Sequence, residues 1–159
     1  MHKAYLLLGS NIGDSKKNIA IANKEIEKQI GKTLRSSSVY ATAAWGNKDQ
    51  PDFLNQIIII NTIHEPLYLL QLILAIEKKM GRIRTQKNAP RTIDIDILFF
   101  DKLIINQPNL IIPHPLISER NFVLVPMNEL SPQFIHPHYN KTIHEMLLKC
   151  KDRLTVKKN

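Results

Sequence analysis

Acidic and apolar residues alternate in the segment at residues 87–98, whose sequence is KNAPRTIDIDIL. Alternation with a period of two predicts a β-strand, with isoleucines on one face and Asp94 and Asp96 on the other. Carboxylates two residues apart on a strand are roughly 6.5–7 Å apart, because each residue advances the strand by about 3.3 Å. That distance is too long for a hydrogen-bonded pair of acids, and it suits Mg²⁺ held between the carboxylates and a polyphosphate.

Three arginines, Arg82, Arg84 and Arg91, precede these acids within a short stretch of chain. Acids that hold a metal and arginines that contact phosphate are components of a phosphoryl- or pyrophosphoryl-transfer site. The simpler alternative is that the acids form the solvated face of a half-buried strand. The apolar pair Phe99-Phe100 indicates that the strand is not at the margin of the sheet, and the arginines favour the chemical interpretation.

The composition indicates a folded protein without covalent cross-links. The chain has 159 residues, which suits a single domain over residues 1–159, and its apolar content of 43% argues against disorder. Its one cysteine, Cys150, excludes an internal disulfide framework and a cysteine-based zinc site. The N-terminus lacks the layout of a signal peptide and no apolar run approaches 18 residues, so we expect a cytoplasmic protein without a membrane partner.

The net charge of +8 raises the question of a nucleic-acid partner. The basic residues are spread thinly in short pairs such as Lys16-Lys17, and no zinc-finger, basic-zipper or RNA-recognition signature is present. The charge therefore fits an anionic small ligand, and nucleic-acid binding is the second hypothesis. His136 and His138 could suggest a metal pair, but no third ligand has a clear spacing.

Hydrophobic periodicity and turn residues divide the chain into alternating strands and helices. Strands are predicted at 3–8, 33–40, 53–63 and 92–100, long helices from a cap at Asp14 or Ser15 to about Ile30 and at 66–80, and short helices near 120–130 and 142–149. The order β-α-β-β-α-β predicts an α+β fold with a ferredoxin-like core, in which a four-stranded antiparallel sheet carries both long helices on one face. The other face would be left for loops and a ligand, and a loop-rich C-terminal extension would follow the fourth strand.

Besides the acidic strand, several short motifs follow one another along residues 5–126. They are Leu8-Gly9-Ser10-Asn11, the segment DQPDFLN at 49–55, Gly81-Arg82-Ile83-Arg84, Pro113-His114-Pro115 and Arg120-Asn121-Phe122. In these motifs and in residues 87–98 the chain resembles 6-hydroxymethyl-7,8-dihydropterin pyrophosphokinase, a family of folate-synthesis enzymes.

The resemblance implies that the β,γ-pyrophosphate of ATP is transferred to the hydroxymethyl group of the dihydropterin, which leaves AMP. It also implies two Mg²⁺ ions held by Asp94 and Asp96, ATP as co-substrate, and a monomer that acts on small molecules rather than on nucleic acid. The implied catalytic residues are Arg82, Arg91, Asp94 and Asp96. The implied ATP-binding residues are Glu77, Arg82, Arg84, Arg91, His114 and Arg120.

The expected pterin-binding residues come from the same resemblance and suit a flat heteroaromatic ring. Phe53 and Phe122 occupy stacking positions, and Asn55 offers a donor and an acceptor to the amide edge of the ring. The residues that match the loop lining the same pocket are Thr42, Ala43 and Trp45. The alternatives are that both phenylalanines belong to the core and that Asn55 only bonds a neighbouring loop.

The chain also departs from the family's pattern. The loop at 82–90 is one residue shorter than the common form and lacks a tryptophan before the Pro-Arg pair. Asn109 and Ile111 stand where an arginine and a hydroxyl residue often help to bind ATP, so we leave both out of the expected ATP site. Two alternative functions stay open, an RNA-binding ferredoxin-like module and another Mg-dependent phosphoryl or nucleotidyl transferase. Asp94 and Asp96 argue against RNA because, without metal, they would repel a phosphate backbone.

Overall fold

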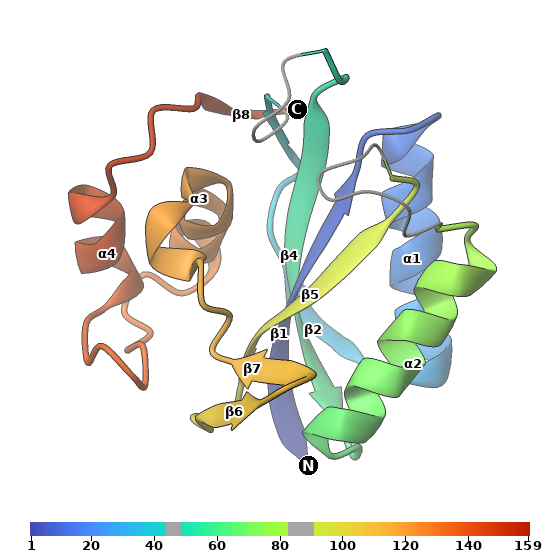
Figure 1. The fold of residues 1–159 in the computed structure, drawn as a ribbon, viewed down its shortest axis with the longest axis horizontal. Coiled ribbons are helices and arrows are strands. Elements are labelled where there is room, and N and C mark those ends of the chain that lie inside the picture. Colours follow the sequence, from blue (N-terminus) through green and yellow to red (C-terminus); the bar gives the residue numbers. More distant parts are fainter. Residues whose placement is uncertain (44–48, 83–90) are drawn as a thin grey trace.

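A six-stranded sheet with helices on both faces organises the computed structural model, which describes residues 1–43, 49–82 and 91–159 (Figure 1). The strands of this sheet are β1 (His2–Ser10), β2 (Thr33–Ser36), β3 (Tyr40–Thr42), β4 (Phe53–Thr62), β5 (Asp94–Phe100) and β8 (Val156–Lys158). A separate hairpin pairs β6 (Ile105–Gln107) with β7 (Leu110–Ile112). The helices are α1 (Ser15–Gln29), α2 (Pro66–Lys79), α3 (Asn121–Leu130) and α4 (Ile143–Lys149), with a 3-10 turn at Ile117–Glu119.

The strand order is β5-β1-β4-β3-β8, and β2 pairs with β4 beside β3. The acidic strand β5 is therefore an edge strand, so the expectation that it is not at the margin of the sheet was wrong. Phe99 and Phe100 are buried because helices cover both faces of the sheet there. Each of these pairings is antiparallel. The four main predicted strands are present, but the sheet has six strands rather than four. The predicted strand at 33–40 is two short strands, because the Ser37 hydroxyl accepts from Ile57 N–H at 3.0 Å and so takes the place of a backbone partner.

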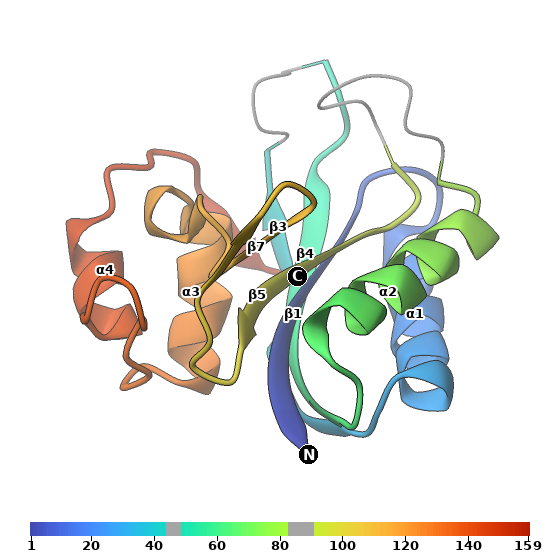
Figure 2. The ribbon, with the colours of Figure 1, turned by 60° about the horizontal axis from the view of Figure 1, so that its bottom comes forward.

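One face of the sheet packs against α1 and α2, as the sequence predicts (Figure 2). Asp14 caps α1 by accepting from Lys17 N–H at 3.1 Å, and Pro66 begins α2, where a missing N–H costs nothing. The buried side chains of this layer include Ile19, Ala22, Ile26, Leu69, Ile73 and Ile76 from the helices and Ile93, Ile95 and Ile97 from the acidic segment. The predicted alternation in that segment is therefore confirmed, since the isoleucines are in the core and the acids face the other way.

The opposite face is partly covered by α3 and α4, so the expectation that this face is left for loops and a ligand was only partly right (Figure 2). The apolar residues of this second layer include Tyr5, Leu7, Ile57, Ile59 and Phe99 from the sheet and Val123, Met127, Ile143 and Met146 from the helices. Both short helices were predicted near their observed positions. Their apolar sides need a partner, and the uncovered half of the sheet provides it.

Two further elements were not predicted, the β6–β7 hairpin and the last strand β8. The three strands involved are each only three residues long, too short for a periodic pattern. Among the described residues, no helix has both the length and the apolar character needed to cross a bilayer.

Candidate active site

Three neighbouring strands place Asp94, Gly9 and Asn55 in one row across the sheet. Gly9 of β1 is the register partner of Asp94 on β5 and of Asn55 on β4. Partners in an antiparallel sheet direct their side chains to the same face. A Cβ at Gly9 would lie 2.7 Å from Asn55 Oδ1, so only glycine leaves the space between the acid and the amide open.

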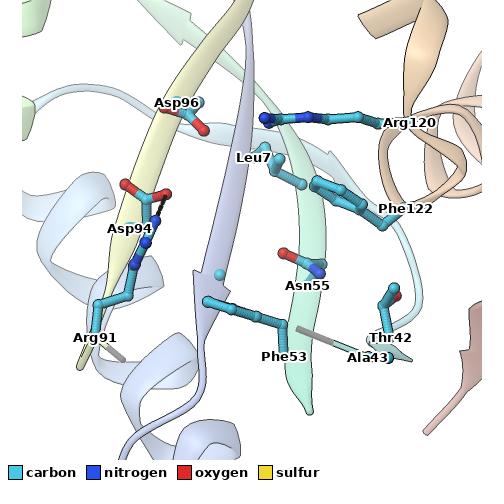
Figure 3. A pocket seen from close by; sticks show the side chains of 11 residues that line it. Leu7, Thr42, Ala43, Phe53, Asn55, Arg91, Asp94, Asp96, Arg120 and Phe122 are labelled. Atoms are coloured by element: carbon cyan, nitrogen blue, oxygen red, sulfur yellow. Dashed lines mark hydrogen bonds and ion pairs between the residues drawn. The ribbon is translucent and has the colours of Figure 1, made fainter. Parts of the chain in front are cut away.

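This open row is the floor of a pocket (Figure 3). The residues that line it are Leu7, Gly9, Thr42, Ala43, Phe53, Asn55, Arg91, Asp94, Asp96, Arg120 and Phe122. They come from β1, β3, β4, β5 and the start of α3, and they include most of the predicted pterin and metal residues. Trp45 and Arg84, which were also predicted, lie outside the described residues.

Asp94 is held by two arginines. Arg82 Nη1 forms an ion pair with Asp94 Oδ1, and Arg91 Nη1 lies 3.1 Å from Asp94 Oδ2. Arg82 Nη1 also lies 3.7 Å from a carboxylate oxygen of Glu77. Because the Arg82 and Arg91 side chains are mostly buried, water screens these ion pairs less than it would at the surface.

Asp96 has a different environment. Burial, followed by the negative charges of Asp94 and Glu77, raises the pKa of Asp96 to about 8, and the positive charges of Arg120 and Arg82 only partly offset this. In Figure 3 the Arg120 guanidinium points towards the Asp96 carboxylate. A cation bound beside this carboxyl group would stabilise its ionised form.

The donor set fits Mg²⁺. Two carboxylates face one hollow, and Mg²⁺ commonly takes one or two protein carboxylates and fills its other positions with water and phosphate oxygens. Within the described ranges, no group of three or more His, Cys, Asp or Glu side chains could form an all-protein metal cage. Asp94 and Asp96 are therefore the residues that could hold a metal together with a phosphate ligand.

The aromatic walls of the pocket are Phe53 and Phe122, which lie on either side of Asn55 (Figure 3). The guanidinium carbon of Arg91 lies 5.4 Å from the centroid of the Phe53 ring, and that of Arg120 lies 5.3 Å from the Phe122 ring. These are cation–π distances, so each ring is held by an arginine. The rings contribute to the wall of the pocket rather than being wholly enclosed in the core.

Polar groups complete this pocket. Asn55 is 4% exposed and opposes Gly9, as described above. The Thr42 hydroxyl is buried and has no hydrogen-bond partner within the part of the chain that the structure describes. A buried polar atom without a partner is costly, so a ligand that offers a hydrogen bond there would be stabilised.

A second hollow lies between α2, β5 and the β6–β7 hairpin. Its lining residues are Leu67, Leu70, Gln71, Leu74, Ile95, Asp96, Ile97, Pro108, Asn109, Leu110, Ile111, His114 and Pro115. Asp96 lines both hollows, whereas Asp94 lines only the first. Asn109 and Ile111, which the sequence analysis left out of the ATP site, line this hollow.

His114 is held as a neutral donor. Its Nδ1 accepts from Leu116 N–H at 3.2 Å, so the ring proton is on Nε2. Burial, together with the positive charge of Arg120, lowers the pKa of His114 to about 4. The ring can therefore donate one hydrogen bond to an anionic ligand without a charge of its own.

Glu77, a predicted ATP residue, lines neither of the two hollows described above. It is 2% exposed, and its carboxylate accepts from Ile95 N–H at 2.8 Å and pairs with Arg82. This environment favours a role in holding β5 and Arg82 over the predicted contact with ATP.

Asn11 is a residue whose role the sequence analysis missed, although it lies in a quoted motif. Its Oδ1 accepts from Arg91 N–H at 2.9 Å, and its Nδ2 donates to Gln50 Oε1 at 2.9 Å and to Pro51 O at 3.2 Å. Asn11 thus ties Arg91 to the segment that leads into Phe53. Its polar side chain directly after an apolar strand was the available signal.

The His136-His138 pair has a structural role. His136 is 2% exposed, and its Nδ1 accepts from the N–H groups of His138 and Tyr139 at 3.1 and 3.2 Å. Burial lowers the pKa of His136 to about 4, and its ring lies edge-on to Phe99. The ring therefore fixes a turn.

Comparisons with a family model and with individual relatives agree on one protein family. The family model for 7,8-dihydro-6-hydroxymethylpterin-pyrophosphokinase matches residues 5–132. A 2-amino-4-hydroxy-6-hydroxymethyldihydropteridine pyrophosphokinase of Synechocystis is 40% identical over 147 residues, which cover 92% of this chain and 75% of that protein. The enzyme of the same name from Methylorubrum extorquens is 39% identical over 150 residues, covering 94% of each.

Larger proteins contain a similar region. The folic acid synthesis protein FOL1 of Dictyostelium discoideum is 42% identical over 145 residues, which cover 91% of this chain but only 22% of that protein. The Plasmodium falciparum HPPK-DHPS crystal structure with pteroate shares the fold with a TM-score of 0.76 at 18% identity, over 93% of this chain and 44% of that one. The match to the family model and the two relatives of similar length show that the chain belongs to the 7,8-dihydro-6-hydroxymethylpterin-pyrophosphokinase family.

Proposed function

We propose that the protein transfers the β,γ-pyrophosphate of ATP to the hydroxymethyl group of 6-hydroxymethyl-7,8-dihydropterin and releases AMP, in folate synthesis. The observation that carries the proposal is the position of Asp96, which lines both hollows, with Asp94 beside it in the first. A transfer between two bound substrates needs such an arrangement, because the reacting atoms must meet between them.

The pocket with aromatic walls suits the pterin. A flat ring can stack between Phe53 and Phe122, and its amide edge can pair with the donor and acceptor of Asn55. The Thr42 hydroxyl, buried and without a described partner, offers a further hydrogen bond. This orientation directs the hydroxymethyl group towards the acids on β5.

The second hollow suits ATP. Its apolar lining on α2 and β5 fits a base, and its polar end holds His114 and Asp96. The triphosphate would then extend towards Asp94, where Arg82 and Arg91 are placed to neutralise charge on the departing and transferring phosphates. Mg²⁺ ions, two by resemblance to the family, would be held by Asp94 and Asp96 and would supply neutralisation of the triphosphate charge.

We also propose that residues 1–159 form one domain with a ferredoxin-like core. The order β5-β1-β4-β3 and the placement of α1 and α2 on one face support this arrangement. α3 and β8 are additions to that core, and they extend and cover the pterin side of the sheet.

The test is a measurement of AMP formation by the purified chain with ATP, Mg²⁺ and the hydroxymethyl-dihydropterin. We expect AMP and the pterin pyrophosphate in equal amounts, and neither product when the pterin is replaced by its 6-methyl analogue, which lacks the accepting hydroxyl. Chelation of Mg²⁺ should stop the reaction. Formation of ADP instead of AMP, or AMP release that is independent of the pterin, would contradict the proposal and favour another Mg-dependent transferase.

A further inference from the structure

The helix that presents Arg120 and Phe122 to the pocket begins without a cap of its own. The residue at the N-cap position of α3 is Arg120, and its side chain makes no capping hydrogen bond. Instead the Arg120 guanidinium points towards Asp96 (Figure 3). A guanidinium has only N–H donors, so the Arg120 side chain cannot accept from the first N–H groups of its helix, which must find acceptors elsewhere.

Asp152, from the C-terminal segment, supplies the missing acceptor. Its Oδ2 accepts from Asn121 N–H at 2.9 Å, and its backbone carbonyl accepts from Asn121 Nδ2 at 3.0 Å. Its other carboxylate oxygen accepts from Leu154 N–H at 3.0 Å, which fixes the turn that carries it. A carboxylate at the N-terminus of α3 also interacts favourably with the helix dipole.

The same segment continues to the opposite wall of the pocket. In Figure 1 the chain runs from α4 past α3 to β8, where residues 156–158 pair with Tyr40–Thr42 of β3. Asn159 N–H then donates to Val39 O at 2.8 Å. β3 ends at Thr42, and Thr42 and the following Ala43 line the pterin pocket. Residues 151–159 therefore link the two walls, and they lie beyond the part of the chain that the family model matches.

We infer that Asp152 is a positioning residue for the pterin pocket, which it serves by holding the peptide between Arg120 and Phe122. Asn121 lies directly between these two residues, so its N–H and side-chain contacts with Asp152 fix the direction in which both neighbours point. The inference rests on the proposed function, because it assigns Phe122 to pterin stacking.

Three variants of the full chain test this role. Asp152→Ala removes the carboxylate, Asp152→Asn keeps one oxygen that can accept from Asn121 N–H, and Lys151→Ala changes an exposed neighbour as a matched control. We expect Asp152→Ala to raise the KM for the pterin about fivefold, which corresponds to the free energy of one lost helix cap. The change in kcat should be smaller. Asp152→Asn should restore most of the pterin KM, and Lys151→Ala should leave both parameters unchanged.

A purely structural role would lower the melting temperature and the active fraction but leave the pterin KM unchanged, and that result would overturn the inference. So would an equal effect of Lys151→Ala. Amide hydrogen exchange provides a readout independent of turnover, since Asn121 should exchange faster in Asp152→Ala than in the other two variants. If the unmodified chain made no AMP, the proposed function would fail, while Asn121 exchange and calorimetric binding of a pterin would still decide the role of Asp152.

Discussion

Replacement of Gly9 by alanine tests whether the missing side chain in the middle of the sheet creates the pterin pocket. A Cβ there would lie 2.7 Å from Asn55 Oδ1, whereas ordinary contact begins at 3.4 Å. The Asn55 amide must therefore move by about 0.7 Å, the difference between these distances, or turn away. Because Asn55 is only 4% exposed, it has little room to move and keep its orientation.

The magnitude follows from the hydrogen bonds that Asn55 would make with the amide edge of the pterin. A typical hydrogen bond contributes about 1 kcal/mol, and leaving a buried partner unsatisfied costs about 1–3 kcal/mol. Loss of the paired contacts therefore costs about 2–3 kcal/mol, or a roughly 30- to 150-fold weaker affinity. ATP affinity should stay close to that of the unmodified chain, since neither Gly9 nor Asn55 lines the second hollow.

The assay is calorimetric binding of the pterin, with a non-hydrolysable ATP analogue present, to Gly9→Ala, Asn55→Ala and the double variant. If the added methyl group acts only through Asn55, the double variant binds the pterin as weakly as Asn55→Ala alone. Additive losses would show that Gly9 acts through the strand itself. An unchanged affinity of Gly9→Ala, with a normal melting temperature, would remove Asn55 from the pterin site and refute the reasoning.

Three further predictions concern the two acids, Arg91 and the far end of the sheet. Asp94→Ala and Asp96→Ala should each lower AMP formation at least about a hundredfold without loss of secondary structure by circular dichroism, and near-normal activity of either variant would contradict the metal assignment. Arg91→Ala should lower kcat about a hundredfold, or on the order of 3 kcal/mol, and weaken pterin binding much less; the opposite pattern would show that Arg91 serves the pterin through its contact with Phe53. At the other end of the sheet, His2 bonds Asp101 at 2.7 Å and Glu65 at 3.3 Å, and the hydrogen bond with Asp101 is the main reason that the pKa of His2 is raised above 6.5. The stabilising effect of protonated His2 is therefore fully present below pH 6.5 and is lost as the pH rises through the raised pKa. In urea unfolding, His2→Ala should lower the stability of the protein more at pH 6 than at pH 9. An equal loss of stability at both pH values would rule out the charged pair.

Much of the helical layer could be predicted from local patterns. The apolar spacing of Ile19, Ala22 and Ile26, with Asp14 before it and Gly31 after it, defines α1 without any tertiary information. Pro66 marks the start of α2 in the same way. These features depend on residues within one or two helical turns of each other, which is why sequence alone was sufficient.

The environments of Glu77 and Asp152 could not be predicted in the same way. The resemblance to the family implies that Glu77 binds ATP. The structure buries it because Arg82 and Ile95 N–H satisfy its carboxylate. Likewise Asp152 gave no signal, since its partner Asn121 is 31 residues away in the chain.

A bulge explains how Asp94 can lie opposite Gly9 while Phe99, further along the same strand, lies opposite Tyr5. The register between β1 and β5 shifts after Tyr5, which opposes Phe99, so that Leu6 opposes Ile97 and Leu98 is the extra residue. Leu98 and Phe99 both belong to the layer under α3 and α4, although strict alternation would place them on opposite faces.

Without the extra residue, Phe99 could not pair with Tyr5 while Asp94 paired with Gly9, because a slip of one residue exchanges the faces of a strand. Bulges commonly redirect side chains beside active sites in this way. The unbroken apolar run from Ile97 to Phe100 hides this irregularity in the sequence. The acidic motif therefore specifies which groups do the chemistry, whereas the bulge four residues after Asp94 sets the register that brings this acid opposite Gly9 and Asn55.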